Sequence, residues 1–293
     1  MSQRDVTFFE SSLSNHLNHL TNNSFEIHSF SSSKYNDSLS DRRWNLQCSE
    51  NSVCLLVLSK PNFFENVIVP HCKKQVSEMM ENCDNDNNHE DQVNFNLDCN
   101  NQMKMASSNL LTDSTQEIFN SGLEFLKTII VPDNCQKPNI KNINIKFHRD
   151  SDMRPGLGPV FLCQTAGHIA KAAYYHQATD LLKKEYNNDN LMGVCLHNKY
   201  GGNFAFRGVY ILDGVDYNIS EENLKIKEDN FRIDYDAGKI GERAIRLLND
   251  DWKEGSWRNV IAGEERYSDV CLKFFSTLPA ERLEYVRKEI LQS

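Results

Sequence analysis

The clearest chemical signal in the sequence is an arginine inside an apolar strand. Residues 203–212, NFAFRGVYIL, have the composition of a β-strand, and Arg207 stands among small or apolar neighbours. Strand alternation predicts one face with Asn203, Ala205, Arg207, Val209 and Ile211, and a second with Phe204, Phe206, Gly208 and Tyr210. A buried guanidinium needs an anion, either an internal carboxylate or the carboxylate or phosphate of a ligand. Gly208 leaves room for another backbone or a ligand to come close.

A second signal is a stripe of small residues. The segment QTAGHIAKAAYYHQ predicts a long helix from about Thr165 to Tyr186. On it Ala166, Ala170 and Ala173 share one side, and Gln177 continues that side one turn later. Such a stripe suits either a flat ligand lying against the helix or close packing on another helix or a sheet.

Single thiols and imidazoles give weaker signals. Cys195 lies on an expected strand, 193–197, which Gly201-Gly202 would join to strand 203–212. It is either a nucleophilic or redox thiol or an inert apolar residue. His168 is either a base or ligand or a structural residue, and His176 and His197 lack partners at ligand spacing. HExxH, GxSxG, P-loop and GxGxxG motifs are absent, so no metal site is predicted.

The remaining elements indicate how these residues are positioned. An amphipathic helix is expected within the first twenty residues, with Phe9, Leu13, Leu17 and Leu20 on one side. We expect strands at 53–59, buried on both faces, and at 143–148. We expect helices at 63–74, near 241–249 and 278–291, and over TQEIFNSGLEFLKTII, with core candidates Ile118, Leu123, Phe125 and Leu126. This order predicts one α+β domain spanning 1–293.

Charge is concentrated in one segment. The net charge is −9, but residues 81–101 hold six Asp or Glu, eight Asn and no Lys or Arg, so the rest carries −9 − (−6) = −3. Residues 81–114 have too few aliphatic side chains to offset the entropy of ordering, and we predict a disordered insertion there. The absence of a basic stripe gives no support for nucleic-acid binding.

Cysteine usage and hydropathy indicate the compartment. Nine cysteines at irregular spacings form neither a disulfide framework nor a zinc motif, which favours reduced thiols. The longest apolar run, 53–58, is too short to cross a bilayer, and the amino terminus lacks the pattern of a secretory signal. We therefore expect a cytoplasmic protein without a membrane partner.

Several longer motifs resemble one family. QTAGHIAKAAYYHQ, GVCLHNKYGGNFAFRGVYIL, WRNV, EERYS and FFSTLPAERL resemble, in order and spacing, the CblC family of methylmalonic aciduria and homocystinuria proteins. Upstream, FEIHSFSSSKYND and VCLLVLSKPNFF resemble its amino-terminal strands. The resemblance covers about Phe25 to Leu283, interrupted at 81–114.

The resemblance implies a nitroreductase-like α+β fold with a mostly antiparallel sheet flanked by helices. It implies an enzyme that binds cobalamin (vitamin B12) base-off, removes cyanide with the help of reduced FAD or FMN, and transfers alkyl groups to glutathione. NADPH would be the indirect reductant, and a CblD-type protein the partner; the chain would be a monomer or a homodimer. Two rival functions are a non-catalytic cobalamin escort and a general flavin-dependent reductase of the same fold.

The resemblance also implies site residues. The corrin pocket would use Asp150, Phe161, Leu162, Cys163, Gln164, Tyr175, His176, Gln177, Cys195 and Phe206. The glutathione pocket would use Arg207, Arg258 and Arg282. Clustered arginines suit this ligand because they bind its carboxylates and favour the thiolate. No protein side chain need coordinate the cobalt.

Two residues depart from the family pattern. Lys171 stands where the family has the glycine of His-x-x-Gly, and we expect its side chain to face outward. Asn203 stands where a tryptophan is expected after the paired glycines, so packing over the corrin or its displaced base would differ.

Overall fold

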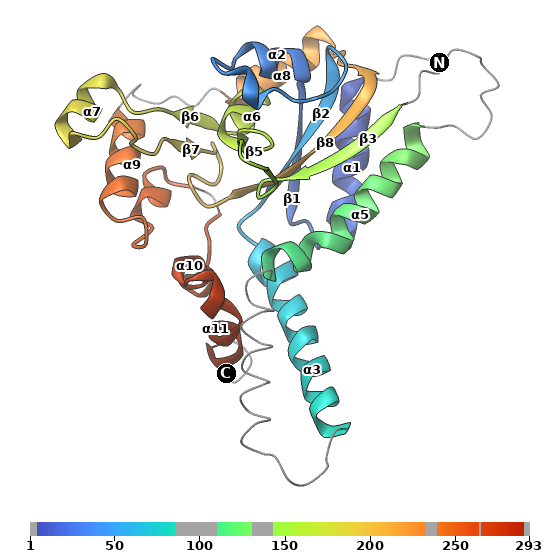
Figure 1. Ribbon diagram of the computed structural model, residues 1–293. Helices are drawn as coiled ribbons and strands as arrows, with labels where there is room; N and C mark the ends of the chain where they lie inside the picture. The colour runs from blue at the N-terminus through green and yellow to red at the C-terminus, as the bar shows by residue number, and fades with distance from the viewer. Residues whose placement is uncertain (1–4, 86–109, 131–142, 232–238, 264, 290–293) are drawn as a thin grey trace. The chain divides into compact units, whose positions relative to one another are not determined.

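The computed structural model describes the chain except for residues 1–4, 86–109, 131–142, 232–238, 264 and 290–293 (Figure 1). The chain divides into two compact units, Met1–Pro61 with Ser121–Arg266, and Asn62–Asn120 with Tyr267–Ser293. Each unit is described by itself, and the single domain expected from the sequence stays a prediction.

The first unit is built on a four-stranded antiparallel sheet. Its strand order is β1 (Phe25–Ser31), β2 (Ser52–Ser59), β8 (Ala205–Asp216) and β3 (Asn144–Arg149). All residues of β2 are buried, as its continuous apolar run predicts for a central strand. β3 is the half-buried edge strand expected near residues 143–148.

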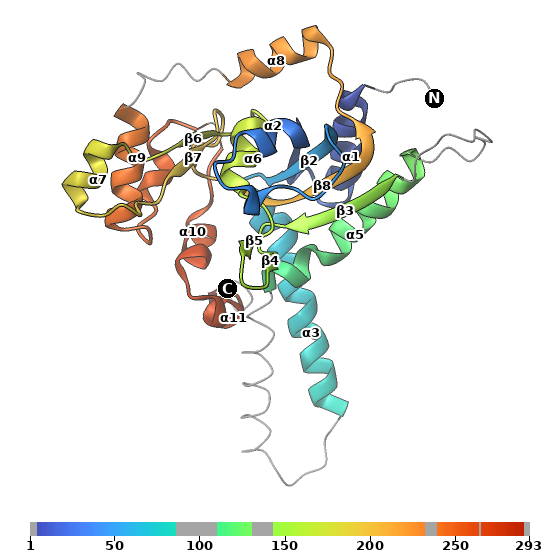
Figure 2. The same ribbon diagram turned by 45° about the horizontal axis from the view of Figure 1, so that its top comes forward.

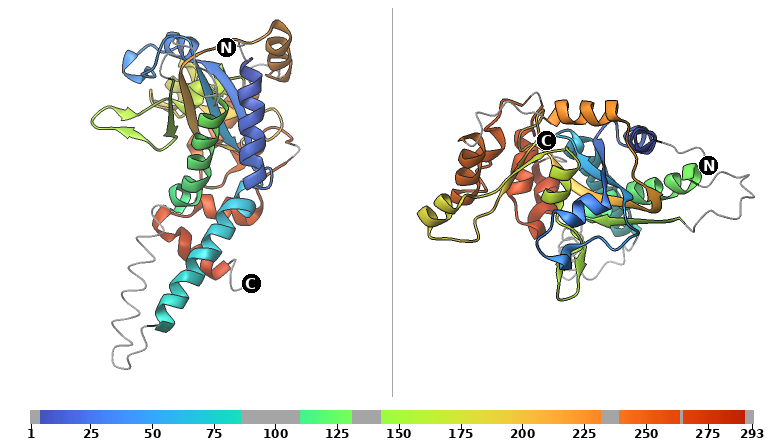
Figure 3. Two further views of the ribbon diagram at one scale, coloured as in Figure 1. Left: turned by 90° about the vertical axis from the view of Figure 1, so that its right-hand side faces the viewer. Right: turned by 90° about the horizontal axis from the view of Figure 1, so that it is seen from above.

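Helices cover both faces of this sheet (Figure 3). On one side lies α1 (Val6–Leu20), which buries Phe9, Leu13 and Leu17 as predicted, whereas Leu20 is exposed. α5 (Leu110–Ile130) packs beside it through Phe125, whose ring stacks on His16 at 4.3 Å. Of the core candidates on α5, Leu126 is buried and the others are half-buried. On the other side, α2 (Ser32–Asp37) and α6 (Cys163–Ile169) pack over the apolar cluster that includes Leu56 and Val209.

The prediction of strict alternation along β8 is wrong, because a bulge falls at Arg207. Leu58 pairs with Phe206 and Val57 pairs with Gly208, so Arg207 is the extra residue on β8. Phe206 therefore packs into the same cluster as Val209. Gly208 does admit a neighbouring backbone, since a Cβ there would lie 2.5 Å from the carbonyl oxygen of His148.

The predicted helix from Thr165 to Tyr186 is also wrong. α6 stops at Ile169, Lys171 has φ 60°, and the backbone N–H of Ala172 donates to the carbonyl of Gly167 at 2.9 Å. This is a left-handed helix end, and it removes Ala173 and Gln177 from the helix on which a stripe was expected. Lys171 is half-buried rather than outward-facing, because its Nζ lies 3.3 Å from Glu228 Oε1 and 4.7 Å from the centroid of the Phe231 ring.

After this turn the chain forms a second small sheet. β6 (Tyr174–His176) pairs antiparallel with β7 (Val194–Leu196), so the expected hairpin of 193–197 with 203–212 is wrong. Instead, a turn between His197 and Gly201 carries the chain from β7 toward β8. α7 (Asp180–Tyr186) and α9 (Lys239–Asp250) pack against the small sheet through Leu182, Ala244 and Ile245 (Figure 2).

Five further elements within the described residues complete the first unit. They are η1 (Arg42–Trp44), β4 (Met153–Arg154), β5 (Gly158–Pro159), α8 (Glu221–Phe231) and η3 (Ser256–Asn259). The helix expected near 241–249 corresponds to α9.

The second unit is helical over its described residues. It contains the π-helical η2 (Phe64–Ile68), α3 (Val69–Asn85), α10 (Asp269–Ser276), η4 (Pro279–Glu281) and α11 (Arg282–Glu289). Phe64 and Phe274 pack with ring centroids 4.9 Å apart. The helices expected at 63–74 and 278–291 are therefore found. α3 and α5 extend helix into both ends of segment 81–114, whose middle, 86–109, lies outside the described residues.

Two further expectations concern the chain as a whole. None of the helices within the described ranges is long and apolar enough to cross a membrane. The cysteines whose surroundings are described are all free, namely Cys48, Cys54, Cys72, Cys163, Cys195 and Cys271.

Candidate functional site

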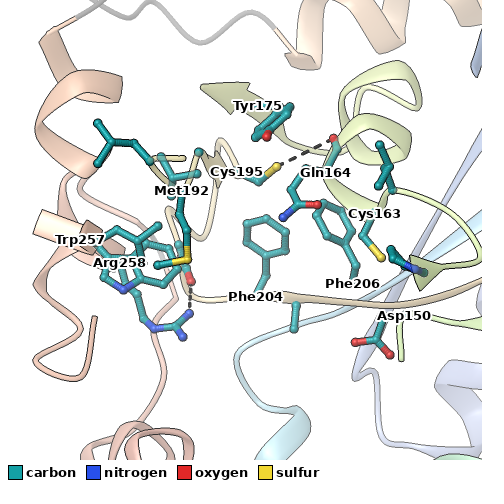
Figure 4. Close-up of a pocket in the computed structure, with 18 of the residues that line it drawn as sticks. Asp150, Cys163, Gln164, Tyr175, Met192, Cys195, Phe204, Phe206, Trp257 and Arg258 are labelled. Atoms are coloured by element: carbon teal, nitrogen blue, oxygen red, sulfur yellow. Dashed lines mark hydrogen bonds between the residues drawn. The ribbon is translucent and has the colours of Figure 1, made fainter. Parts of the chain in front are cut away.

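A cleft of about 660 Å³ opens in the first unit between the main sheet and the small β6–β7 sheet. This volume lies in the range of small-molecule and cofactor pockets. Most of the predicted corrin-pocket residues line it: Asp150, Phe161, Leu162, Cys163, Gln164, Tyr175, Cys195 and Phe206. Arg258 lines it as well, so segments more than 100 residues apart in the sequence meet at one surface (Figure 4).

Two aromatic rings stand in the middle of the cleft. Phe204 and Phe206 pack edge to face with ring centroids 5.3 Å apart, and Figure 4 shows both rings among the lining residues. Phe206 reaches this position because the bulge at Arg207 turns it to the cluster side of β8. The pair gives the cleft an apolar wall that suits the face of a large ring system.

The cysteines of the cleft are poor nucleophiles. Burial raises the pKa of Cys163 to about 12 and raises the pKa of Cys195 far above its ordinary value. The Sγ of Cys195 lies 3.9 Å from the carbonyl oxygen of Gln164. Thiolate at either position is scarce near neutral pH, which favours the inert alternative for Cys195.

Arg258 is held at the edge of the cleft by its neighbours. Its Nη1 donates to the carbonyl of Gly202 at 2.6 Å, and its guanidinium lies 4.3 Å from the centroid of the Trp257 ring. Trp257 and Gly202 line the cleft too. A guanidinium that is stacked on an aromatic face and lines an open cleft can bind a carboxylate.

The three arginines of the expected glutathione pocket are not all brought together. Arg207 is 7% exposed and is not among the cleft-lining residues; its Nε donates to Ser59 Oγ at 2.9 Å. Arg282 belongs to the second unit, where its Nε donates to the carbonyl of Thr277 at 3.3 Å. Within the first unit, Arg258 lines the cleft and Arg207 does not.

Asp150 is the acidic neighbour of Arg207. Its backbone N–H donates to the carbonyl of Arg207 at 3.3 Å. Loss of hydration by the surrounding protein raises the pKa of the Asp150 carboxyl, even though part of the residue is exposed to solvent. The positive charge of the nearby Arg207 guanidinium opposes this shift. Arg207 therefore has an internal carboxylate within electrostatic reach, and both alternatives for its anion stay open.

His176 and Gln177 lie at a different hollow. With Tyr175, Gly241 and Glu242 they line a pocket of about 360 Å³, and only Tyr175 also lines the main cleft. Burial and the nearby His168 lower the pKa of His176 to about 4, so this imidazole is neutral near pH 7. His168 packs edge to face against Tyr174 and Phe231, as a structural histidine would.

Sequence reasoning missed several cleft residues. They are Pro159, Leu191, Met192, Gly193, Val194, Gly202, Phe204, Ala205, Leu248 and Trp257. A usable signal was the glycines: a Cβ at Gly202 would lie 2.6 Å from the Trp257 ring, and one at Gly193 would lie 2.7 Å from that of Tyr175. At both positions an aromatic ring occupies the space that a side chain in place of the glycine would need.

Comparison with known proteins places this chain. It is 28% identical over 261 residues to a chicken protein named cyanocobalamin reductase / alkylcobalamin dealkylase, covering 88% of each chain. A mouse protein of the same name is 33% identical over 184 residues, covering 58% of this chain and 64% of the relative. The solved C. elegans CblC, titled a B12-trafficking protein, superposes with a TM-score of 0.66 at 21% identity, covering 97% of this chain and 98% of that one.

The likenesses to the chicken protein and to the solved C. elegans structure extend over most of the chain. The described sheet and helices share the fold of the solved C. elegans protein. Residues 24–286 match the methylmalonic aciduria and homocystinuria type C family. The matched range takes in most of each unit of the structure. The chain belongs to the methylmalonic aciduria and homocystinuria type C family.

Proposed function

We propose that this chain binds cobalamin base-off in the main cleft and removes its upper axial ligand, acting as a cyanocobalamin reductase and alkylcobalamin dealkylase. The observation that carries the proposal is the convergence of Asp150, Phe161–Gln164, Tyr175, Cys195 and Phe206 on one open cleft in a member of this family. The cleft is wide and largely apolar at its centre, as a corrin face requires.

The two reactions differ in where the electrons come from. In decyanation, cobalt(III) accepts an electron from a reductant, the cobalt–carbon bond breaks, and cyanide leaves with the bonding pair. In dealkylation, the thiolate of glutathione attacks the alkyl carbon, a sulfur–carbon bond forms, and the pair of the cobalt–carbon bond stays on cobalt as cobalt(I). Displacement of the lower base removes a donor from cobalt and so makes it easier to reduce.

The chain's own residues bind, orient and exclude water. Phe204 and Phe206 would cover the corrin face and keep solvent from it. Arg258 would bind a glutathione carboxylate and favour the ionised thiol beside the cobalt. Arg207 and Arg282 stay part of this proposal as further glutathione-positioning residues, and Tyr175 would join the cleft to the pocket that holds His176 and Gln177.

Reduced FAD or FMN would supply electrons for decyanation when bound, with NADPH as the indirect reductant. Among the residues that line the described cleft, Arg258 alone is Lys or Arg, and it already holds Gly202, so we assign no residue to a flavin phosphate. We further propose a nitroreductase-like fold, a cytoplasmic location and a CblD-type partner that receives the product, in keeping with the family resemblance.

A cobalamin titration followed by visible absorbance tests the function. Addition of near-stoichiometric protein should convert the spectrum from base-on to base-off, and glutathione should then consume bound methylcobalamin. Unchanged spectra with cyano-, methyl- and hydroxocobalamin would refute the proposal. A base-off spectrum without turnover in either reaction would instead identify a cobalamin escort, and yellow protein that reduces quinones without cobalamin would identify a general flavin reductase.

A further inference from the structure

A cluster of polar side chains lies outside the cleft, where β1 meets the turn that follows β7. Glu26 and His28 share one face of β1, and His197 and Tyr200 approach them from the turn. Glu26 Oε2 lies 3.1 Å from His28 Nε2 and 3.3 Å from His197 Nε2, and the Tyr200 hydroxyl donates to Glu26 Oε1 at 2.5 Å. His197 and Tyr200 are each 3% exposed.

Glu26, His28 and His197 place ligand atoms within 4.8 Å of one another, a spacing that a metal ion could use. The hydrogen bonds argue for a different role. The backbone N–H of Lys199 donates to His197 Nδ1 at 3.1 Å, so the proton of this neutral imidazole is assigned to Nε2, which then donates to Glu26. Lys171 and Lys199 line the same hollow and oppose a second cation there.

The charge states fit this arrangement. Burial acts to raise the pKa of Glu26, but hydrogen bonds from His197 and His28 outweigh it and hold the pKa well below its usual range. Burial lowers the pKa of His197, so the imidazole stays neutral. A carboxylate in a low-dielectric setting makes strong hydrogen bonds, and it therefore holds the groups that donate to it in place.

The turn that Glu26 fixes leads directly to the cleft. His197 and Gly201 exchange two backbone hydrogen bonds of 2.8 and 2.9 Å. The carbonyl of Tyr200 accepts from the backbone N–H of Asn203 at 2.9 Å and from its Nδ2 at 3.0 Å. Asn203, 1% exposed, also places Nδ2 3.3 Å from the Arg258 carbonyl and 3.2 Å from Asn259 Oδ1. The polar residue that departs from the family's tryptophan thus ties the turn to η3.

Two glycines leave little slack between the turn and Arg258. Gly202 donates its N–H to the Arg258 carbonyl at 2.9 Å, and Arg258 Nη1 returns a bond to the Gly202 carbonyl. A Cβ at Gly201, where φ is +58°, would lie 2.6 Å from that same Arg258 carbonyl. A displacement of the turn therefore moves Gly202, Trp257 and Arg258, which together form one wall of the cleft.

We infer that Glu26 is a positioning residue for Arg258, acting through Tyr200, His197 and Asn203. The link to thiol binding rests on the proposed function, whereas the link to the Trp257–Arg258 wall does not. In this view the network keeps the guanidinium at one place in the cleft before any ligand arrives, so the ligand does not have to order it.

The test replaces Glu26 in full-length protein that carries Trp44→Phe and Trp252→Phe, which leaves Trp257 as the only tryptophan. Glu26→Gln keeps the shape but puts an amide N–H against donors. We expect acrylamide to quench Trp257 more strongly, and the KM for glutathione in methylcobalamin dealkylation to rise about tenfold, the scale of one lost charged hydrogen bond. The kcat at saturating glutathione should stay within about twofold, because Glu26 lies outside the cleft.

Controls separate position from stability and charge. Glu10→Gln removes a similarly buried carboxylate that bonds Lys227 and Ser29 rather than the turn, and it should leave both readouts unchanged. Tyr200→Phe removes one donor to Glu26 with less risk to folding and should move both readouts in the same direction.

Unchanged Trp257 quenching in folded Glu26→Gln and Tyr200→Phe proteins would overturn the inference. Stabilisation of the parent protein by Zn²⁺, but not of the Glu26→Gln protein, would also overturn the inference. It would show that Glu26 and the histidines bind a metal ion, and a His197 Nε2 that binds metal cannot donate a proton to Glu26. If the dealkylation assay fails altogether, Trp257 quenching still decides the positioning role.

Discussion

A Cβ atom at position 167 would lie 2.3 Å from the Cζ atom of Phe206, so the Phe206 ring occupies the space that any side chain at Gly167 would need. Gly167 is on α6 and Phe206 is on β8, and Phe206 lines the cleft. The depth of the cleft beside α6 therefore depends on a glycine that itself does not line it.

This relationship predicts the effect of Gly167→Ala. The added methyl should push the Phe206 ring into the cleft and weaken cobalamin binding by about 1–3 kcal/mol, the usual scale of overpacking. Phe206→Leu in the same chain should recover most of the loss, because the shorter side chain vacates the contested space. Cobalamin titrations of the two single variants and the double variant give the coupling energy. Additive effects would contradict this account.

A second prediction concerns the left-handed residue that ends α6. Lys171 has φ 60°, a conformation that costs a non-glycine residue about 1–2 kcal/mol. Both Lys171→Gly and Lys171→Ala lose the contacts to Glu228 and Phe231, but only glycine relieves the backbone. We expect the glycine variant to exceed the alanine variant by about 1 kcal/mol in free energy of unfolding, measured by urea denaturation.

The order should reverse at a helical position. At Lys183, inside α7, glycine should be about 1 kcal/mol less stable than alanine, since helix interiors disfavour glycine by that amount. Equal stabilities of the two variants at position 171 would show that the turn carries no left-handed strain.

The same lysine shows how far the sequence could predict the structure. The apolar run of β2, the amphipathic face of α1 and the helix α9 are strong local patterns, and the structure contains all three. The end of α6 has no local signal, because the residue in the left-handed position is a lysine rather than a glycine. The family resemblance implies a glycine at this position, but the predicted helix ran through it all the same.

The sequence predicted only part of the cleft, because some of its features depend on contacts between segments far apart in the chain. Motif matching identified Phe161–Gln164, Tyr175 and Cys195, which the structure brings to one surface. The bulge at Arg207 and the pairing of β7 with β6 depend on contacts between distant strands, and strand periodicity carries no information about them. The cluster of Glu26, His28 and His197 was not predicted, because His197 lies 169 positions after His28 in the sequence and sequence spacing shows no link between them.

A third prediction follows from the lowered pKa of His176. Since its folded pKa, about 4, lies below the ordinary value near 6.5, the folded state favours the neutral ring. This contribution to stability is complete above about pH 6.5 and is lost as the pH falls from there toward 4. The loss should be on the order of 1–3 kcal/mol.

Burial also lowers the pKa of other histidines, namely His16, His71, His148 and His168, so the measurement compares two proteins. The difference in free energy of unfolding between the parent and His176→Gln should shrink from pH 7.5 to pH 4.5. An unchanged difference would show that His176 is protonated as easily in the folded protein as in the unfolded chain.

The last prediction concerns the arginine that first drew attention in the sequence. Arg207→Gln should weaken the glutathione step by about 1.5–3 kcal/mol, the range for hydrogen bonds to charged groups, while cobalamin binding survives. Its burial and its bond to Ser59 mean that the same change should also lower the free energy of unfolding.

Arg246→Gln, which breaks an exposed bidentate pair with Glu185, provides a control for loss of one positive charge. If Arg207 binds a ligand carboxylate, the KM for glutathione rises while the KM of the Arg246 variant stays at the parent value. If its anion is the internal carboxylate of Asp150, stability falls but dealkylation kinetics remain those of the parent, and Arg258 alone would then serve the thiol.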